Sequence, residues 1–463
     1  MAPRTSRTRP PRPPARARRS WRRPPARPRR RSESRSVPES GWPAPTAPGP
    51  VDAQVVVPGS KSQTNRALLL AGLADGPSTL DGVLRSRDTT LMRAGLTALG
   101  VGFQELGPGR LRILPPDRLH HAEKPVDCGL AGTVMRFLPA AAATAPGPTR
   151  FIGDPAASAR PVAPVLEGLS QLGVRVEGDR LPFTVDPPAR LGGPHATIDS
   201  SGSSQFVSAL LLSGARYPHG IDLRHRGPAV PSAPHIAMTC TMLAERGVEV
   251  STPDPDHWRV RPGPIAAMDA TVEPDLTNAA VFLAAAMVTA GRLTIPGWPE
   301  RTTQPGVDFL DVARSMGARV ARSGDRLSVI GGEQLHGAEV DLHEASELTP
   351  VVAALAALAH GRTRISGVAH IRGHETDRLA ALEEQLSAVG AEVRQTPDGL
   401  VVEGRGPAAL HGALLRCHDD HRMAHAAALI GLVVSGVVLD DVSCTSKTMP
   451  DFPQMWSDMI GPR

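Results

Sequence analysis

Six short polar segments each precede a run of small and apolar residues, and they hold side chains suited to binding anions. The start of a helix offers unpaired N–H groups and the positive end of the helix dipole, so it is a natural anion site. Serine, threonine, asparagine and aspartate there could act simply as helix caps, but capping does not require the Lys, Arg and Gln that stand beside them. The pattern therefore predicts an anionic ligand, bound by GSKSQTNR (59–66), CGLAGT (128–133), SSGSSQ (200–205), PDLTN (274–278), EASELT (344–349) and HDDHR (418–422).

The elements that position these segments repeat along the chain. Five amphipathic segments end in glycine and continue as two short alternating strands around a turn, with 70 to 74 residues between successive glycines. A glycine just past a helix end suits the left-handed C′ position, and the GD, PD and DG turns suit hairpins. The repeat predicts five helix–hairpin units, marked by Gly100, Gly173, Gly247, Gly317 and Gly390.

A second kind of helix follows each polar segment and is apolar nearly all round, which predicts that it is buried. Six such helices against five hairpins leave the last unit incomplete, ending in a short predicted helix over 452–460. We expect residues 51–58 (VDAQVVVP) to supply the strand that completes this unit. That strand would return the N-terminal segment to the C-terminal half of the chain and give two domains of three units each.

The composition narrows the class of protein. Hydrophobic residues make up 41% and charged residues 21% of the 463 residues, as in ordinary soluble proteins. No run of about 18 apolar residues occurs, so no membrane span is expected. The four cysteines form no CxxC pair, which argues against a disulfide framework or a structural zinc site and favours a reducing cytoplasm. With 14 aromatic residues, the chain has few platforms for stacking nucleic-acid bases.

Residues 1–40 differ from the rest of the chain. They hold 14 Arg against two Glu, a net charge of +12, whereas the remaining residues sum to −7. A segment so rich in charge and proline cannot bury enough surface to fold, and we expect it to be disordered. It could be an arm for nucleic acid or a membrane surface, or a transit peptide. We favour a third interpretation, in which translation starts further along the chain, near Val37.

Seven segments stand in order along the chain: PGSKSQTNRALLLAGL, GLAGTVMRFLPA, GDPAASARP, SSGSSQFVSALLL, GHETDRLAAL, DDHRMAHAAAL and TSKTMPDF. From about residue 42 to the end, they resemble the motifs of the 3-phosphoshikimate 1-carboxyvinyltransferase (EPSP synthase) family. The resemblance implies an α/β (α+β) enolpyruvyl-transferase fold, with six βαβαββ-like units, three per domain, and pseudo-threefold symmetry. It implies an N-terminal domain of residues 59–273, a C-terminal domain of 41–58 plus 274–463, and an active site in the cleft between them.

The resemblance also implies the reaction. The enolpyruvyl group of phosphoenolpyruvate moves to the 5-hydroxyl of shikimate 3-phosphate through a tetrahedral intermediate and phosphate is released, a step toward chorismate and the aromatic amino acids. The family is the target of glyphosate. The expected partners are these two small molecules, with no cofactor, no metal and no membrane, in a cytoplasmic monomer for which nucleic acid is not an expected partner.

The family's site residues carry over position by position. The resemblance makes Lys61, Glu347 and Glu375 the candidates for proton transfer and catalysis. Shikimate 3-phosphate would be bound by Lys61, Ser62, Arg66, Ser203, Ser204, Gln205, Ser232, Glu347, His370 and His374. Phosphoenolpyruvate would be bound by Lys61, Gly132, Arg160, Gln205, Arg378, Arg422 and Lys447.

Five positions depart from the usual family residues. Glu347 stands where the family more often has Asp, and its extra methylene could shift the geometry. His370 and His374 replace Asn and Lys, and His235 stands where some members place an aromatic hydroxyl. Leu130 stands where Asn is frequent, so no side-chain contact with substrate is expected there.

Two other functions stay open. The related transferase that acts on UDP-N-acetylglucosamine shares the fold, but it has Asn after the first Lys, where this chain has Ser62, and usually a reactive loop Cys. A nucleic-acid-binding role would rest on the arginine-rich segment alone.

His421 and His425, one helical turn apart, could also suggest a metal site, but the apolar pattern around His425 favours packing.

Overall fold

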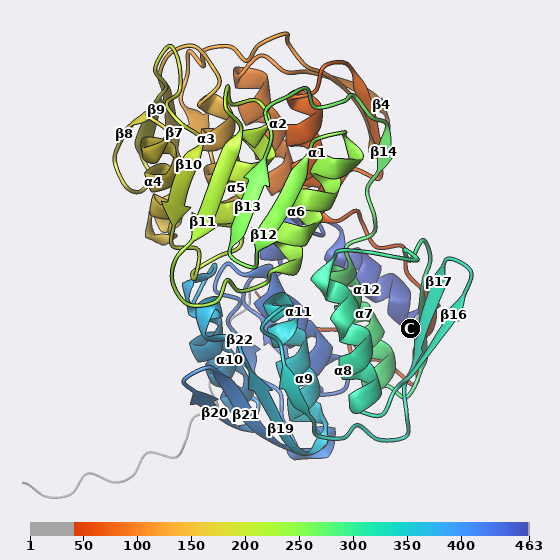
Figure 1. The fold of residues 1–463 in the computed structure, drawn as a ribbon. Coiled ribbons are helices and arrows are strands. Elements are labelled where there is room, and N and C mark those ends of the chain that lie inside the picture. The colour runs from red at the N-terminus through yellow and green to blue at the C-terminus, as the bar shows by residue number, and fades with distance from the viewer. Residues whose placement is uncertain (1–40, 462–463) are drawn as a thin grey trace, which may run out of the picture. The chain divides into compact units, whose positions relative to one another are not determined.

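The computed structural model describes residues 41–461, so the expectations about residues 1–40 lie outside the described part of the chain. Six small sheets are present, five with four strands and one with three. We call residues 59–273 the N-terminal lobe and residues 41–58 with 274–461 the C-terminal lobe, because their buried apolar side chains form two separate clusters that divide at these positions. Figure 1 shows the first in red to green and the second mainly in teal to blue.

The N-terminal lobe contains three sheets with strand orders β14-β3-β5-β4, β6-β7-β9-β8 and β10-β11-β13-β12. Each sheet joins a parallel pair of strands to an antiparallel hairpin. The strands are β3 (Ser78–Asp81), β4 (Gly102–Gly107), β5 (Arg110–Leu114), β6 (Val126–Asp127), β7 (Thr149–Ile152), β8 (Arg175–Glu177), β9 (Phe183–Asp186), β10 (His195–Ile198), β11 (Ile221–His225), β12 (Val250–Asp254), β13 (His257–Val260) and β14 (Ala270–Thr271).

The C-terminal lobe repeats this plan in the orders β2-β15-β17-β16 and β18-β19-β21-β20, followed by the shorter sheet β1-β23-β22. The strands are β1 (Trp42–Pro43), β2 (Asp52–Gln54), β15 (Arg292–Ile295), β16 (Arg319–Ser323), β17 (Arg326–Ile330), β18 (Glu339–Asp341), β19 (His360–Ser366), β20 (Glu392–Thr396), β21 (Gly399–Arg405), β22 (Leu414–Leu415) and β23 (Val438–Leu439). The six-unit fold expected from the sequence is confirmed.

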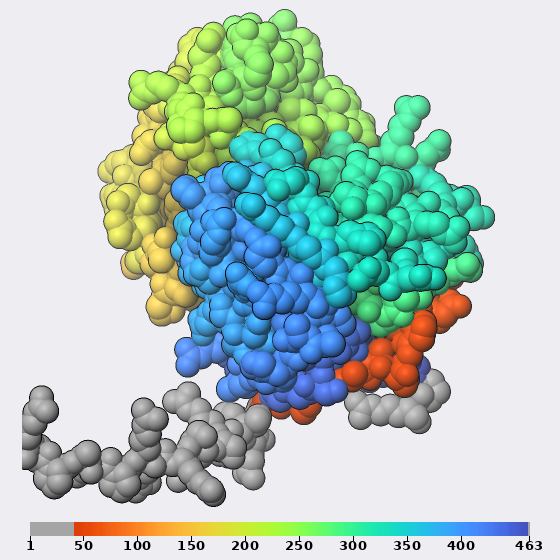
Figure 2. Space-filling view, turned by 90° about the horizontal axis from the view of Figure 1, so that it is seen from below, coloured from red at the N-terminus to blue at the C-terminus, as the bar shows by residue number. Residues whose placement is uncertain are grey.

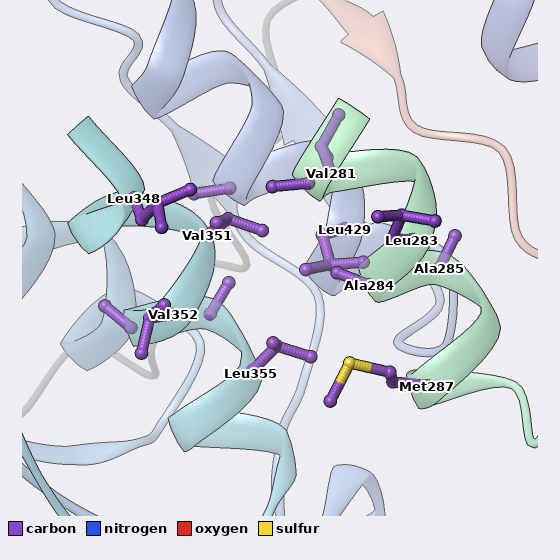
Figure 3. Close-up of a cluster of buried hydrophobic side chains, with 14 of the residues drawn as sticks. Val281, Leu283, Ala284, Ala285, Met287, Leu348, Val351, Val352, Leu355 and Leu429 are labelled. Atoms are coloured by element: carbon purple, nitrogen blue, oxygen red, sulfur yellow. The ribbon is translucent and has the colours of Figure 1, made fainter. Parts of the chain in front are cut away.

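Six helices predicted to be buried form the interior of the two lobes. They are α1 (Lys61–Gly72), α3 (Gly132–Ala142), α5 (Gln205–Gly214), α7 (Leu276–Val288), α9 (Thr349–Leu358) and α11 (His421–Gly431). Each packs against the other two buried helices of its own lobe, which gives the pseudo-threefold arrangement. Figure 3 shows side chains of α7, α9 and α11, among them Met287, Leu355 and Leu429, converging in the C-terminal core.

The amphipathic helices also form where the repeat predicts them. They are α2 (Arg87–Ala98), α4 (Ala163–Gln171), α6 (Pro234–Glu245), α8 (Phe309–Ser315) and α10 (Arg378–Ala388), and the short last helix is α12 (Phe452–Ile460). All five glycines that follow α2, α4, α6, α8 and α10 have φ between 75° and 102°. This is the left-handed conformation that favours glycine at a helix end.

The strand expected over 51–58 lies in the C-terminal lobe, but in a different sheet from the one predicted. β2 pairs in parallel with β15 and so completes the sheet β2-β15-β17-β16, whereas β1 pairs with β23 and completes the last sheet. The pairing of β1 could not be predicted from the sequence, because β1 has two residues, too few to show a strand pattern. Residues 41–58 therefore contribute to two sheets of the C-terminal lobe, and Figure 2 shows this red to orange segment against teal and blue atoms.

Two chain crossings join the lobes and lie side by side. Ser60 N donates to Glu273 O at 2.8 Å, and Asp275 N donates to Pro58 O at 2.9 Å. Gly59 sits in this crossing, and a Cβ added there would lie 2.0 Å from Gly82 O. A side chain at Gly59 therefore cannot be accommodated without moving backbone.

Gly59→Ala should lower the free energy of unfolding by about 1–3 kcal/mol, because it overpacks the crossing. Gly49→Ala is the matched control, since an added Cβ there meets nothing within 4 Å. Urea denaturation of both variants measures the difference. Equal stability of the two variants would show that the crossing relaxes freely.

Candidate active site

The six buried helices begin around one cavity between the lobes. The first turns of α1, α3, α5, α7 and α11 each contribute a lining side chain, and Glu347 lines the cavity just before α9. The sequence predicted an anion site at these helix starts, and the fold brings all six together. The lining residues named beforehand are Lys61, Ser62, Arg66, Ser203, Ser204, Gln205, Ser232, Glu347, His370, His374 and Arg422.

A buried guanidinium, that of Arg378 at the start of α10, organises the C-terminal wall. Its side chain is 1% exposed. It donates to Asp420 Oδ2 at 2.7 Å, to Glu347 Oε2 at 3.0 Å and to Glu375 Oε2 at 2.9 Å. Burial acts to lower the pKa of Arg378, but Asp420, Glu347 and Glu375 outweigh it and hold the pKa well above its usual value. The arginine is therefore a permanent charge that fixes both predicted acid–base carboxylates.

Glu375 is surrounded by three cations. Besides Arg378, it pairs with Lys447 Nζ, and its Oε1 lies 3.7 Å from Arg160 Nη2 of the opposite lobe. Burial acts to raise the pKa of Glu375, but Lys447, Arg160 and Arg378 hold it well below its usual range. Glu375 is thus an ionised carboxylate that links the lobes.

Glu347 has the same character on the other side of Arg378. Its Oε2 pairs with Arg422 Nε as well as with Arg378. Burial acts to raise the pKa of Glu347, but Arg422 and Arg378 hold it well below its usual range. A partly exposed, ionised carboxylate at this position can accept a hydrogen bond from a ligand hydroxyl.

Two histidines stand beside Glu347 in place of the usual family residues. His374 Nδ1 lies 2.9 Å from Arg378 Nη1, and since a guanidinium has no acceptor, Nδ1 accepts and the ring proton sits on Nε2. Burial, reinforced by Arg378, lowers the pKa of His374 to about 3. Burial and His343 lower the pKa of His370 to about 4. Both rings are therefore neutral hydrogen-bonding groups near neutral pH, unlike a lysine.

In the N-terminal lobe, Arg160 and Arg136 lie against Gly132. A Cβ on Gly132 would lie 3.0 Å from Arg160 Nη2 and 3.3 Å from Arg136 Nη1. Arg160 Nη1 donates to Leu130 O at 2.7 Å, so position 130 contributes its backbone. Arg136 donates to Gln205 Oε1 at 2.8 Å and orients that predicted ligand.

Lys61 and Arg66, both on α1, differ in how far they are buried. Lys61 Nζ lies 3.5 Å from Asp88 Oδ2 and faces the cavity. Arg66 is 1% exposed and donates to Thr239, Ser208, Ser62 O and His235 O. Most of its N–H groups are therefore used within the protein, where they fix the Ser62 backbone. Burial lowers the pKa of Arg66 to about 9.

The serines form the remaining polar wall. Ser203, Ser204 and Ser232 all line the cavity. Ser232 has φ of 52°, its N donates to His343 O at 3.1 Å, and its Oγ lies 3.2 Å from Ser346 Oγ. Both contacts cross from one lobe to the other. Ser232 therefore also ties the lobes together.

Asp420 is a functional residue that the sequence did not single out. Its Oδ1 accepts from Arg422 N at 2.9 Å and caps α11, while Oδ2 binds Arg378. An aspartate just before a helix is typically interpreted as a cap. Its second role, binding the guanidinium of Arg378, depends on a residue 42 positions away in the sequence. Its place inside HDDHR was the available signal. Among residues 41–461, no group of three or more His, Cys, Asp and Glu side chains is arranged to hold a metal ion.

His425 packs as the apolar pattern predicted. Its ring centroid lies 4.7 Å from that of Phe452, and that of His421 lies 5.8 Å away. Burial, with a contribution from Arg422, lowers the pKa of His425 to about 3.

A family model described as EPSP synthase (3-phosphoshikimate 1-carboxyvinyltransferase) matches residues 45–456. Two structures of EPSP synthase from Acinetobacter baumannii are similar to this chain, with 22% identity and TM-scores of 0.74 and 0.73 over 90% of this chain and 96% and 97% of theirs. The enolpyruvyl transferase NikO from Streptomyces tendae is similar at 20% identity, with a TM-score of 0.70 over 90% of this chain and 98% of its own. At these identities the structures show a shared fold.

His425→Phe should make the protein less sensitive to acid. The depressed pKa of His425 means that its neutral form stabilises the fold fully above the unfolded value of 6.5, and that this stability is lost as the pH falls toward 3. Between pH ~7.5 and ~5, His425→Phe should lose about 2 kcal/mol less unfolding free energy than the unaltered protein. Urea titrations at both pH values measure this, with exposed His219→Phe as control. An unchanged pH dependence would contradict the interpretation.

Proposed function

The chain belongs to the EPSP synthase (3-phosphoshikimate 1-carboxyvinyltransferase) family, and we propose that the cavity between its lobes is where it transfers the enolpyruvyl group. The donor is phosphoenolpyruvate, the acceptor is the 5-hydroxyl of shikimate 3-phosphate, and phosphate leaves. The observation that carries this assignment is the Arg378 cluster. It holds two ionised carboxylates, Glu347, which lines the cavity, and Glu375, which also pairs with Lys447 and Arg160.

Phosphoenolpyruvate carries a carboxylate and a phosphate, so its site needs several cations. Arg160 faces the cluster from the N-terminal lobe, while Arg378, Arg422 and Lys447 belong to the C-terminal lobe. Arginine offers paired donors to carboxylate and phosphate, whereas lysine acts as a compact charge. We place phosphoenolpyruvate among these groups and against Gly132, with Lys61 reaching both substrates.

Shikimate 3-phosphate fits the more polar end of the cavity. Ser203 and Ser204 precede α5, so their hydroxyls and the N–H groups of the first turn suit the 3-phosphate. Ser62, Arg66, Gln205 and Ser232 complete this end in our proposal. His370 and the Nε2–H of His374 are placed to bind ring hydroxyls or phosphate as neutral groups.

The two carboxylates divide the proton transfers. Glu347, ionised and partly exposed, accepts the proton of the 5-hydroxyl as that oxygen attacks. The Glu375–Lys447 pair lies beside carbon 3 of phosphoenolpyruvate, which gains a proton as carbon 2 becomes cationic and loses one when phosphate departs. A single pair can serve both steps because the proton returns along the same path. The surrounding cations stabilise the departing phosphate.

We propose that the two lobes are the two domains and that transfer requires them together. Arg160 of one lobe pairs with Glu375 of the other, and Ser232 contacts His343 and Ser346. Closure of the domains would complete the site and exclude water.

No helix of residues 41–461 is long and apolar enough to span a membrane. We propose a cytoplasmic monomer, and the four free thiols suit a reducing compartment.

The test is phosphate release by the purified protein with phosphoenolpyruvate and either shikimate 3-phosphate or UDP-N-acetylglucosamine. Release should require shikimate 3-phosphate. Lys61→Ala and Glu375→Gln should each lower kcat by about 100-fold or more, whereas exposed Lys124→Ala should leave it unchanged. Phosphate release with UDP-N-acetylglucosamine alone would assign the chain to the other transferase activity. Absence of phosphate release with either acceptor would contradict the proposed function.

Gly132→Ala should raise the KM for phosphoenolpyruvate by about tenfold with a smaller change in kcat. Its Cβ pushes against Arg160 Nη2 at 3.0 Å and so moves a donor to the substrate. Inhibition by glyphosate should weaken in the same variant, because the added methyl group occupies space beside position 132 that an inhibitor would otherwise fill. Steady-state kinetics with varied phosphoenolpyruvate measure both effects, and an unchanged KM would place the substrate elsewhere.

A further inference from the structure

Asp88 is a buried carboxylate in the first turn of α2 that its own helix does not use. The cap of α2 is a reciprocal pair, in which Ser86 Oγ accepts from Thr89 N at 3.4 Å and Thr89 Oγ1 accepts from Ser86 N at 3.0 Å. Asp88 is 2% exposed, and its Oδ2 has no hydrogen-bond partner among the described residues. Helix capping therefore does not explain why an acid is retained at this position.

The charge of this carboxylate acts on two lysines, one from each lobe. Lys61 Nζ lies 3.5 Å from Asp88 Oδ2. α2 also contacts the short helix η6 (Ser443–Lys447) of the C-terminal lobe, which ends in Lys447. The charge of Asp88 acts on the Lys447 ammonium, since it counteracts the lowering of the pKa of Lys447 by burial. Positive and negative charges consequently alternate between the lobes, from Arg160 to Glu375, Lys447, Asp88 and Lys61.

A buried carboxylate costs free energy unless cations compensate it. Lys61 and Lys447 are the cations placed to do so, and both belong to the proposed transfer site. We propose that Asp88 is a positioning residue of this site, whose carboxylate holds the ammonium group of Lys61 and acts through its charge on the ammonium group of Lys447 in the other lobe. This inference rests on the proposed function for its kinetic consequence.

The sign of the pH effect follows from the charges that face Lys447. Glu375 and Asp88 raise its pKa, whereas burial, Lys61 and Arg160 lower it, and His421 lies close enough for its own pKa to be lowered by the ammonium. Removing the charge of Asp88 lowers the pKa of Lys447 further. The lysine then loses its proton at a lower pH, and the alkaline limb of the activity profile moves to lower pH.

Asp88→Asn removes the charge at constant size and should lower kcat/KM for phosphoenolpyruvate by about tenfold or more, with the alkaline limb displaced by about one pH unit. Asp88→Glu should restore the position of the limb even where the rate recovers only in part. Asp311→Asn is the matched control, because Asp311 occupies the first turn of the equivalent helix α8 but is exposed. An alkaline limb that stays in place in Asp88→Asn would overturn the proposal, whatever the rate.

A second measurement does not depend on turnover. The chain has three lysines, so acetylation by limiting acetic anhydride at a series of pH values, followed by peptide mass spectrometry, reports on each amine separately. Exposed Lys124 serves as the internal reference. In Asp88→Asn, Lys447 should become reactive at lower pH while Lys124 does not change. Unchanged Lys447 reactivity would overturn the proposal even in an active enzyme, and a shift in a protein without transferase activity would instead fault the proposed function.

Discussion

The structure of the cavity depends on one buried cation, the guanidinium of Arg378. An arginine at 1% exposure is tolerated because three carboxylates surround it, and of these Asp420 is itself fully buried. The same contacts fix Glu347 and Glu375 at one wall and keep both ionised. Glu347 and Glu375 belong to the unit of α9 and α10, and Asp420 precedes α11, so the guanidinium also joins the second unit of the C-terminal lobe to the last one. The proposed acid–base groups are thus held by an interaction that the fold itself needs.

The repeated fold explains why such a site lies between the lobes. Each unit buries a helix whose first turn points to the cavity, so six helix starts converge there without any long loop. Each lobe alone presents an incomplete set of charges. Lys61, Asp88 and Arg160 come from the N-terminal lobe, and Glu375 and Lys447 come from the C-terminal lobe. Pairing between Arg160 and Glu375 therefore brings charged groups of both lobes together.

Much of this arrangement could be read from the sequence, for identifiable reasons. Glycines at a spacing near 73 residues and apolar helices after polar segments revealed the six units, because helix ends and burial leave local patterns. The exchange of β1 and β2 between sheets could not be predicted, since strands of two and three residues leave no such pattern. Asp420 and Asp88 were missed because their partners are distant in sequence. The neutral state of His374 likewise follows from its burial and its contact with Arg378 and not from its residue type.

The central claim is that this wall of carboxylates and cations protonates and then deprotonates carbon 3 of phosphoenolpyruvate. The most direct test is to run the reaction in deuterium oxide and to measure deuterium at the vinyl carbon of the product by mass spectrometry. Because carbon 3 passes through a methyl group that can rotate before a hydrogen is removed, the product should contain deuterium when shikimate 3-phosphate is the acceptor, and Glu375→Gln should reduce the labelled product with the total. Product that forms without any deuterium at this carbon would contradict the account.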